Sequence, residues 1–250
     1  MAGRGSFTEA FDLFGYNIEN YDDLFIEKLL MLLEIDKHEI LDWKGGKFTP
    51  KVDHKGIYPR TQKPIPISVA SGGSINSTIR TAELGLPIVY AIIGGNPLDF
   101  KPMITLYREV AKKAGHDLSK MPVSAHSWGW LNQDKDRAIK EYFYPTKLLV
   151  DQISKERPHW TGMTYDQYLE SVGENGAIFV GDSEAVVNKI IKVMEELGLN
   201  RFYLHLPIAS MPHEEVMNAI KIYGEEVVPK VKEHFKKKED KKRLNVKWKD

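Results

Sequence analysis

The segment that decides the fold is PIPISVASGGSINSTIRTAELGLP, residues 64–87. It predicts a short buried strand at residues 65–70, then a loop of small residues, and then a helix. A loop that leads from a strand into a helix N-terminus presents free backbone N–H groups, and the helix dipole favours an anion there. Gly72 and Gly73 let a phosphate approach the backbone without interference from Cβ atoms. The segment therefore indicates an anion site, with an ordinary serine-capped turn as the alternative.

Strands and helices alternate along the rest of the chain. An amphipathic helix is predicted at residues 21–36, and a hairpin is predicted within residues 39–60. Apolar runs predict further strands at residues 88–93, 122–131, 177–180 and 200–206. Periodic segments predict helices at residues 100–114 and 134–156, after Asp182 or Ser183, and from His213 onward. This alternation predicts a parallel sheet covered by helices, which is an α/β fold.

The composition is that of a soluble globular protein, with 42% hydrophobic and 28% charged residues among 250. Lysine plus arginine equals aspartate plus glutamate, 35 each, so no global field attracts nucleic acid or an acidic membrane. The absence of cysteine excludes disulfides and a cysteine nucleophile and is compatible with a reducing compartment. No apolar run is long enough to span a bilayer. We therefore expect a cytoplasmic protein with neither a nucleic-acid nor a membrane partner.

The chain is expected to form one domain over residues 1–235, followed by a different kind of segment. Residues 236–250, KKKEDKKRLNVKWKD, have no apolar period. They predict a solvated, flexible, lysine-rich tail, with contact to nucleic acid or anionic lipid as the alternative.

Three loops follow predicted strands: Gly3–Ser6, after a short strand at the N-terminus, Ser71–Ser77 and Gly94–Asn96. Ligands of parallel α/β folds gather at the carboxyl ends of the strands, so these loops are expected to line one face. Arg4 follows the first short strand, and its guanidinium either clamps a phosphate or is an ordinary surface group. His126 and His205 lie within strands, as core histidines or as a general base. Trp128 and Trp130 border either a flat ligand or the packed rim of a barrel.

Several segments, taken in order, resemble the bacterial luciferase-like flavin-dependent monooxygenases. They include GRGSFTEAFDLFGY and YDDLFIEKLLMLLE near the start, GIYPRTQKPIPISVASGGS and RTAELGLPIVYAIIGG, LYREVAKKAGHD, GAIFVGDSEAVVNKI, and the closing IKIYGEEVVPKVKEHF. The resemblance extends from Ala2 to about Phe235, nearly the whole chain.

The resemblance implies a TIM-barrel-like fold that binds reduced FMN, or in some branches a deazaflavin, at its C-terminal face. The implied activity is that of a monooxygenase, which uses O₂ to oxidise a small organic substrate. The implied partners are that substrate, a flavin reductase or NAD(P)H that supplies the reduced flavin, and further copies of the chain in a homo-oligomer. The implied cofactor-binding residues are Arg4, Ser71, Gly72, Gly73, Ser74, Ser77, Ile93, Gly94 and Gly95, and the implied substrate-pocket residues are His126 and Trp128.

One departure from the family concerns the beginning of the barrel. In the family three βα units precede the GRGS segment, whereas here almost nothing precedes it. We therefore expect an incomplete barrel that lacks its first strands, because five strands cannot close a cylinder. The alternatives to the enzyme are a non-catalytic flavin-binding or partner-assembled fragment, and an unrelated barrel enzyme that acts on sugar phosphates.

Overall fold

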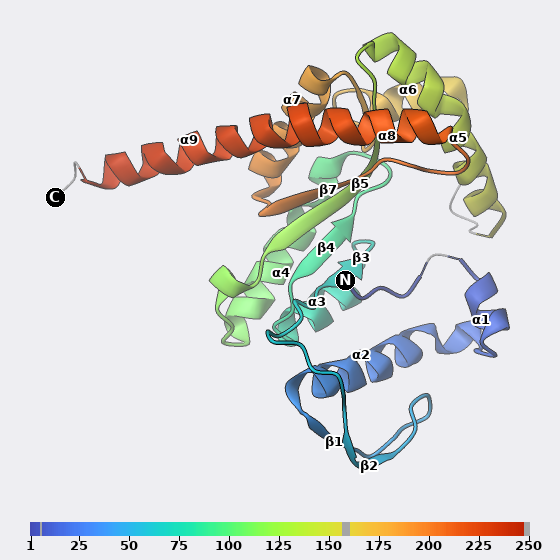
Figure 1. Cartoon of the computed structure of the whole chain (residues 1–250), viewed down its shortest axis with the longest axis vertical. Coiled ribbons are helices and arrows are strands. Elements are labelled where there is room, and N and C mark those ends of the chain that lie inside the picture. The colour runs from blue at the N-terminus through green and yellow to red at the C-terminus, as the bar shows by residue number, and fades with distance from the viewer. Residues whose placement is uncertain (6, 157–160, 248–250) are drawn as a thin grey trace. The chain divides into compact units, whose positions relative to one another are not determined.

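The computed structural model covers the chain and describes residues 1–5, 7–156 and 161–247, with the last nine of these described as backbone only. The chain divides into two compact units, Met1–Ala70 and Ser71–Asp250 (Figure 1).

The first unit contains two helices and a hairpin. Helix α1 is Glu9–Leu13, α2 is Tyr21–Lys37, and the antiparallel strands β1 and β2 are Ile40–Trp43 and Val52–Gly56. The predictions of the long helix and of the hairpin are confirmed, and α1 is an element that the sequence analysis missed. Ala2 pairs in parallel with Val69, so the N-terminus adds a short bridge as expected.

The sheet of the second unit is parallel where β4 pairs with β5 and where β5 pairs with β6 and with β7. Its strands are β3, Val69–Ser71, which lies across the boundary between the units; β4, Ile88–Ala91; β5, Val123–Leu131; β6, Phe179–Gly181; and β7, Arg201–His205. The order is β3-β4-β5-β6, and β7 also pairs with β5. Within the described part of the chain these strands do not close into a barrel. The predicted α/β fold with an open parallel sheet is confirmed.

The helices of the second unit follow the predicted alternation. They are α3, Ile75–Glu83; α4, Lys101–Lys113; α5, Lys135–Glu156; α6, Tyr165–Val172; α7, Ser183–Leu197; α8, His213–Ile222; and α9, Val228–Lys247. A π-helical segment, Tyr223–Val227, joins α8 to α9. Helix α6 was not predicted. None of the helices in the described ranges is long and apolar enough to cross a lipid bilayer.

Two predicted segments differ in length from the observed ones. A strand was predicted at residues 65–70, but β3 begins at Val69 and ends at Ser71. Pro64 and Pro66 lack the N–H donors that a ladder requires, so the strand starts after them. The backbone of residues 236–247 continues α9, and residues 248–250 of the predicted tail lie outside the described residues. The flexibility of this tail stays a prediction.

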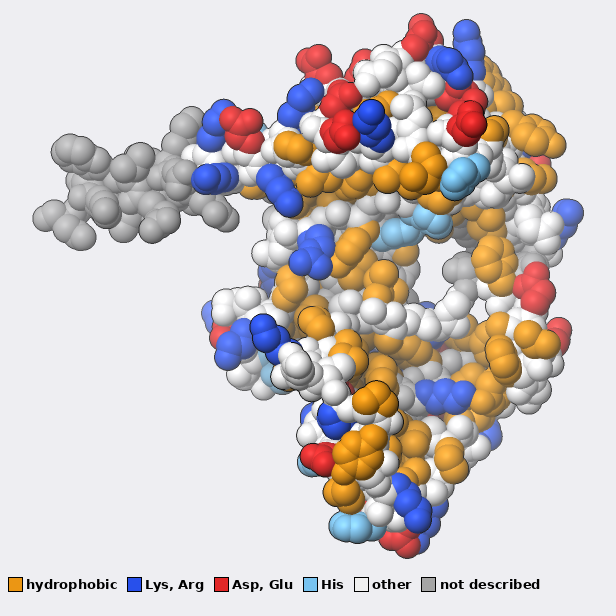
Figure 2. All heavy atoms as spheres, in the orientation of Figure 1, with side chains coloured by type: hydrophobic (Ala, Val, Ile, Leu, Met, Phe, Trp, Pro, Cys, Tyr) orange, Lys and Arg blue, Asp and Glu red, His pale blue; other side chains and the backbone are white. Residues whose placement is uncertain are grey.

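The core of the second unit contains large aromatic side chains. Trp130, Tyr90, Tyr107, Tyr142 and Phe179 are each almost completely buried. The ring of Trp130 stacks on that of Tyr142, with centroids 5.8 Å apart and an angle of 11° between the planes. On the face of the molecule shown in Figure 2, acidic and basic side chains are interspersed.

Candidate functional site

The loop between β3 and α3 has the geometry of a helix N-terminus that is open to a ligand. Ser74 is the N-cap, and its side chain accepts a hydrogen bond from the Ser77 backbone N–H at 3.3 Å. This cap leaves the N–H groups of Ile75 and Asn76 without an intrahelical acceptor. Ser71 and Ser77 are buried, whereas Ser74 is exposed. The loop can therefore direct backbone donors and a hydroxyl toward an anion.

Glycine is present at the two positions of this loop for different structural reasons. A Cβ on Gly72 meets no atom within 4 Å, so the space beside its backbone is open. Gly73 has φ +92°, and a Cβ there would lie 2.8 Å from the Phe100 ring. Gly73 is thus required by the fold, and Gly72 leaves room for a ligand.

A second glycine loop follows β4. Gly94 and Gly95 are exposed, and a Cβ on either of them meets no atom within 4 Å. The loop ends at Asn96, whose side chain caps the following helical turn by accepting a hydrogen bond from Leu98 N–H at 3.0 Å. That turn carries Phe100, which contacts the first loop at Gly73. The two predicted loops therefore belong to one edge of the sheet.

A cavity of about 520 Å³ adjoins the second loop. Ile93, Gly94 and Gly95 line one side of it, and the C-terminal part of α6 with the turn that follows lines another. The residues from this second side are Glu170, Ser171, Asn175 and Gly176. Among the described residues that line the cavity, none comes from the segment Ser71–Ser77. The two loops follow the neighbouring strands β3 and β4, and the Phe100 ring lies close to Gly73.

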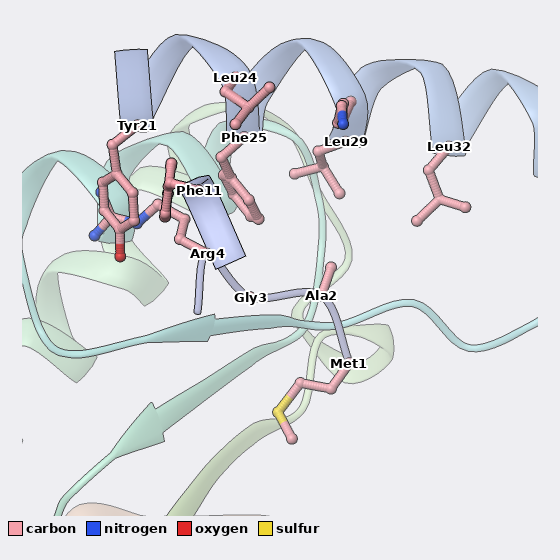
Figure 3. Close-up of a pocket in the computed structure, with 11 residues that line it drawn as sticks. Met1, Ala2, Gly3, Arg4, Phe11, Tyr21, Leu24, Phe25, Leu29 and Leu32 are labelled. Carbon is pink, nitrogen blue, oxygen red and sulfur yellow. The ribbon is translucent and has the colours of Figure 1, made fainter. Parts of the chain in front are cut away.

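Arg4 belongs to the first unit. It lines a cavity of about 380 Å³, into which Phe25 and Leu29 of α2 point (Figure 3). Its guanidinium lies 4.4 Å from the centroid of the Tyr21 ring and pairs with the carboxylate of Asp22. A phosphate at Arg4 would therefore share the guanidinium with Asp22. The role of Arg4 as a phosphate ligand stays a prediction.

His126 and His205 lie side by side on β5 and β7. Their ring centroids are 5.5 Å apart, and His126 is level with Ala91, the last residue of β4. Burial lowers the pKa of His126, and repulsion by His205 lowers it further. Burial also lowers the pKa of His205. Both rings are therefore kept neutral at the carboxyl edge of the sheet, as a proton acceptor requires.

The lowered pKa values of the two histidines predict the pH dependence of stability. As the pH falls below about 6.5, the unfolded chain binds protons at these positions before the folded chain does, so the free energy of unfolding decreases. Urea denaturation at pH 5.5 and pH 7.5 measures this decrease. The double variant His126→Gln/His205→Gln is expected to show a smaller decrease, and an equal decrease in both proteins would contradict the prediction.

Trp128 is buried in the core of the second unit, with 5% of its surface exposed. Its predicted place beside the substrate is not tested by this burial and stays a prediction. Among the described residues, no three His, Cys, Asp or Glu side chains come together as a metal site.

The site contains residues that sequence reasoning missed or placed differently. Glu170, Ser171, Asn175 and Gly176 line the cavity beside Gly94, but the sequence analysis did not recognise the helix that supplies them. A signal for this helix was present, because Thr164 and Gln167 form a capping box at its N-terminus.

A model of the luciferase-like monooxygenase family matches residues 1–201. The chain therefore belongs to the luciferase-like monooxygenase family. This confirms the family that the sequence segments indicated.

A curated relative is 5,10-methylenetetrahydromethanopterin reductase from Methanopyrus kandleri, which is 28% identical over 160 residues. The match covers 55% of this chain and 43% of the relative, so the chain spans less than half the length of that protein.

Three solved structures share the fold. Monooxygenase RslO1 from Streptomyces bottropensis has a TM-score of 0.72 at 19% identity, covering 91% of this chain and 67% of that one. The oxygenating constituent of 3,6-diketocamphane monooxygenase from Pseudomonas putida, in complex with FMN, has a TM-score of 0.65 at 20% identity, and the match covers 91% of this chain and 69% of that one. The coenzyme F420-dependent tetrahydromethanopterin reductase from Methanopyrus kandleri has a TM-score of 0.61 at 18% identity, and the match covers 91% of this chain and 72% of that one. The fold is thus the luciferase-like, TIM-barrel-like one, and it is present here as an open sheet.

Proposed function

We propose that this chain binds the phosphate of a flavin-type cofactor and belongs to an oxidoreductase that acts on a small organic substrate. The cofactor is reduced FMN or a deazaflavin. Membership of the luciferase-like family supports the oxidoreductase class, and the fold is shared with an FMN complex and with an F420-dependent reductase. With FMN, the reaction is a monooxygenation that uses O₂. A flavin reductase or NAD(P)H supplies the reduced cofactor, and the protein acts in the cytoplasm as a homo-oligomer.

The observation that carries this proposal is the open backbone beside Gly72, at the N-terminus of α3. The free N–H groups of Ile75 and Asn76 and the exposed hydroxyl of Ser74 fit the oxygens of a phosphate. A neutral ligand gains much less from a helix N-terminus. The donor set therefore favours the phosphorylated end of the cofactor.

The second glycine loop and its cavity fit the remainder of the cofactor or the substrate beside it. Ile93, Gly94 and Gly95 bring backbone atoms to the cavity without side-chain obstruction. When bound, the flavin supplies the redox chemistry, and the chain's own residues bind it, orient it and exclude water. His126 and His205 are neutral bases at the same edge of the sheet and are able to accept a proton from a substrate.

Binding is expected to depend on the phosphate. Titration of the protein with FMN and with riboflavin, followed by flavin fluorescence, should give a dissociation constant about 10 to 100 times lower for FMN. The reason is that hydrogen bonds to a charged group contribute about 1.5–3 kcal/mol, and each 1.4 kcal/mol is a factor of ten. Equal affinities for the two ligands would contradict a phosphate site. A parallel titration with coenzyme F420 separates the deazaflavin from FMN.

The alternative function is flavin binding without turnover. It is favoured by the open sheet, since the described strands do not enclose a pocket on all sides as a closed barrel does. This alternative would be supported by tight FMN binding without oxidation of an organic substrate in an assay where a flavin reductase and NAD(P)H supply reduced FMN. Turnover by the chain alone would support the enzyme.

A further inference from the structure

Lys189 of α7 makes an unusual set of contacts for a lysine. Its ammonium donates hydrogen bonds to three backbone carbonyls, those of Val172 at 3.2 Å, Gly173 at 2.6 Å and Ile178 at 2.8 Å. It also lies 4.9 Å from the centroid of the Phe179 ring. All three donors of one ammonium are thus used within the protein, and none of its acceptors is a carboxylate.

The three carbonyls belong to a single turn, which connects α6 to β6. Val172 is the last residue of α6, Gly173 is its C-cap, and Ile178 immediately precedes β6. The last carbonyls of a helix lack intrahelical partners, so Lys189 satisfies groups that otherwise need water. Two backbone hydrogen bonds close the same turn, from Gly176 N–H to the Gly173 carbonyl at 3.1 Å and from Ile178 N–H to the Ser171 carbonyl at 2.9 Å.

This turn separates two cavities. On one side, Ser171, Asn175 and Gly176 line the cavity that contains Gly94 and Gly95. On the other side, a cavity of about 440 Å³ is lined by Val172, Gly173 and Glu174 of the turn. Lys189 lines this second cavity as well, so its side chain contacts the turn on the side away from the Gly94–Gly95 loop.

We propose that Lys189 is a positioning residue, whose amino group holds residues 171–178 in place as the wall that faces the Gly94–Gly95 loop. The ligand whose site is shaped in this way is the flavin of the proposed function, on which this part of the inference rests. Nothing in the luciferase-like assignment requires a lysine here; the role follows from the three carbonyl contacts and from the turn's place between the cavities.

The charge of Lys189 is opposed by its surroundings. Burial and, to a lesser extent, the nearby ammonium of Lys192 together lower the pKa of Lys189 to about 7. The other charged groups that face it are Glu174 of the turn and Lys135 of α5, while β6 contributes no titratable side chain. The neutral amine still donates two hydrogen bonds, so the contact with the turn persists after deprotonation.

The sign of the resulting pH effect is fixed by linkage. An open turn exposes Lys189 and returns its pKa toward the ordinary value of 10.5, so protonation favours the open turn. The closed turn is therefore expected to become more stable as the pH rises from 7 to 9, by up to about tenfold in the opening constant per pH unit. A contact that held the turn without titrating would show no such slope.

The test replaces Lys189 by methionine, which keeps the apolar stem and removes the donors. Backbone hydrogen exchange at residues 173–178, measured by mass spectrometry, is expected to become at least about ten times faster, and FMN binding about ten times weaker. The matched control is Lys192→Met, because the hydrogen bonds of Lys192 to the described residues of the turn go to the side chains of Glu174 and Asn175 and not to its backbone. Its exchange and FMN affinity are expected to change by less than about twofold.

Two further variants complete the experiment. Lys189→Arg keeps the charge and the donors and is expected to exchange as slowly as the wild-type protein at residues 173–178. Exchange in this variant that is as fast as in Lys189→Met argues against the hydrogen-bonding role. If the methionine variant does not fold, Lys189→Gln, whose side chain is shorter than that of lysine and does not reach all three carbonyls, is expected to show the same local loosening.

The outcomes separate this inference from the proposed function. Unchanged exchange in the Lys189→Met protein overturns the role of Lys189. FMN binding that is equally tight in this variant and in the wild-type protein overturns it as well. In the wild-type protein, an opening constant (the observed exchange rate divided by the intrinsic rate at the same pH) that does not fall between pH 7 and 9 overturns the pH dependence. If the wild-type protein binds no flavin, the proposed function fails, and the exchange experiment alone decides whether Lys189 holds the turn.

Discussion

Replacing Trp130 by alanine is expected to lower the free energy of unfolding by about 3–5 kcal/mol. Trp130 is 1% exposed, and its ring stacks on Tyr142. Its Nε1–H donates to Glu141 Oε2 at 3.0 Å, so the substitution leaves both a cavity and a carboxylate with one donor fewer. The loss falls where β5 packs on α5.

Urea denaturation followed by far-ultraviolet circular dichroism measures this loss without depending on tryptophan fluorescence. Trp130→Phe is the matched control, because it keeps an aromatic ring against Tyr142 but removes the donor to Glu141. We expect the control to lose about 1–2 kcal/mol. An alanine variant that loses less than about 1 kcal/mol would show that this stack is not a main support of the core.

Replacing Gly72 by aspartate is expected to weaken FMN binding by about 100-fold or more. The new carboxylate would occupy the open space beside the N-terminus of α3, where the phosphate is expected to bind, so it both blocks and repels the ligand. Because a Cβ at Gly72 meets no atom within 4 Å and its φ is not in the left-handed region, the fold should tolerate the change. Fluorescence titration with FMN gives the affinity, and thermal denaturation gives the stability.

Gly224→Asp is the control for added charge, because Gly224 is also exposed and open but lies in the π-helical segment between α8 and α9. We expect its FMN affinity to be that of the wild-type protein. Riboflavin provides a second control, since it lacks the phosphate and its weaker binding should differ little between Gly72→Asp and wild type. Loss of FMN binding in both aspartate variants would argue against a local phosphate site.

The parts of the fold that follow from short-range pattern were predictable. Helix α2 has its apolar residues at helical spacing and begins and ends within a residue of its predicted bounds. The apolar run that contains β4 and the cap at Asp182 before α7 have equally local signals, since the Asp182 side chain accepts from Ala185 N–H. The turn after β3 and the start of α3 were predictable because glycines, serines and a helix start stand together in the sequence, whereas the anion site there stays a prediction.

The parts that depend on distant partners were not predictable. Nothing around Lys189 in the sequence indicates that its amino group reaches the end of another helix. His126 and His205 were both noted as strand histidines, but their pairing depends on the neighbouring registers of β5 and β7. Arg4 was expected to be available to a phosphate, and its contact with Asp22, eighteen residues away, is again a matter of tertiary structure.

The turn between α6 and β6 is a shared wall of two cavities. A molecule that fills the cavity beside Lys192 and shifts the turn changes the affinity of the cavity beside Gly94. Reciprocity makes the factor the same in both directions, so a flavin would alter the binding of that second molecule by an equal amount. Lys189, which lines the cavity beside Lys192 and donates to the carbonyls of the turn, would carry such an effect.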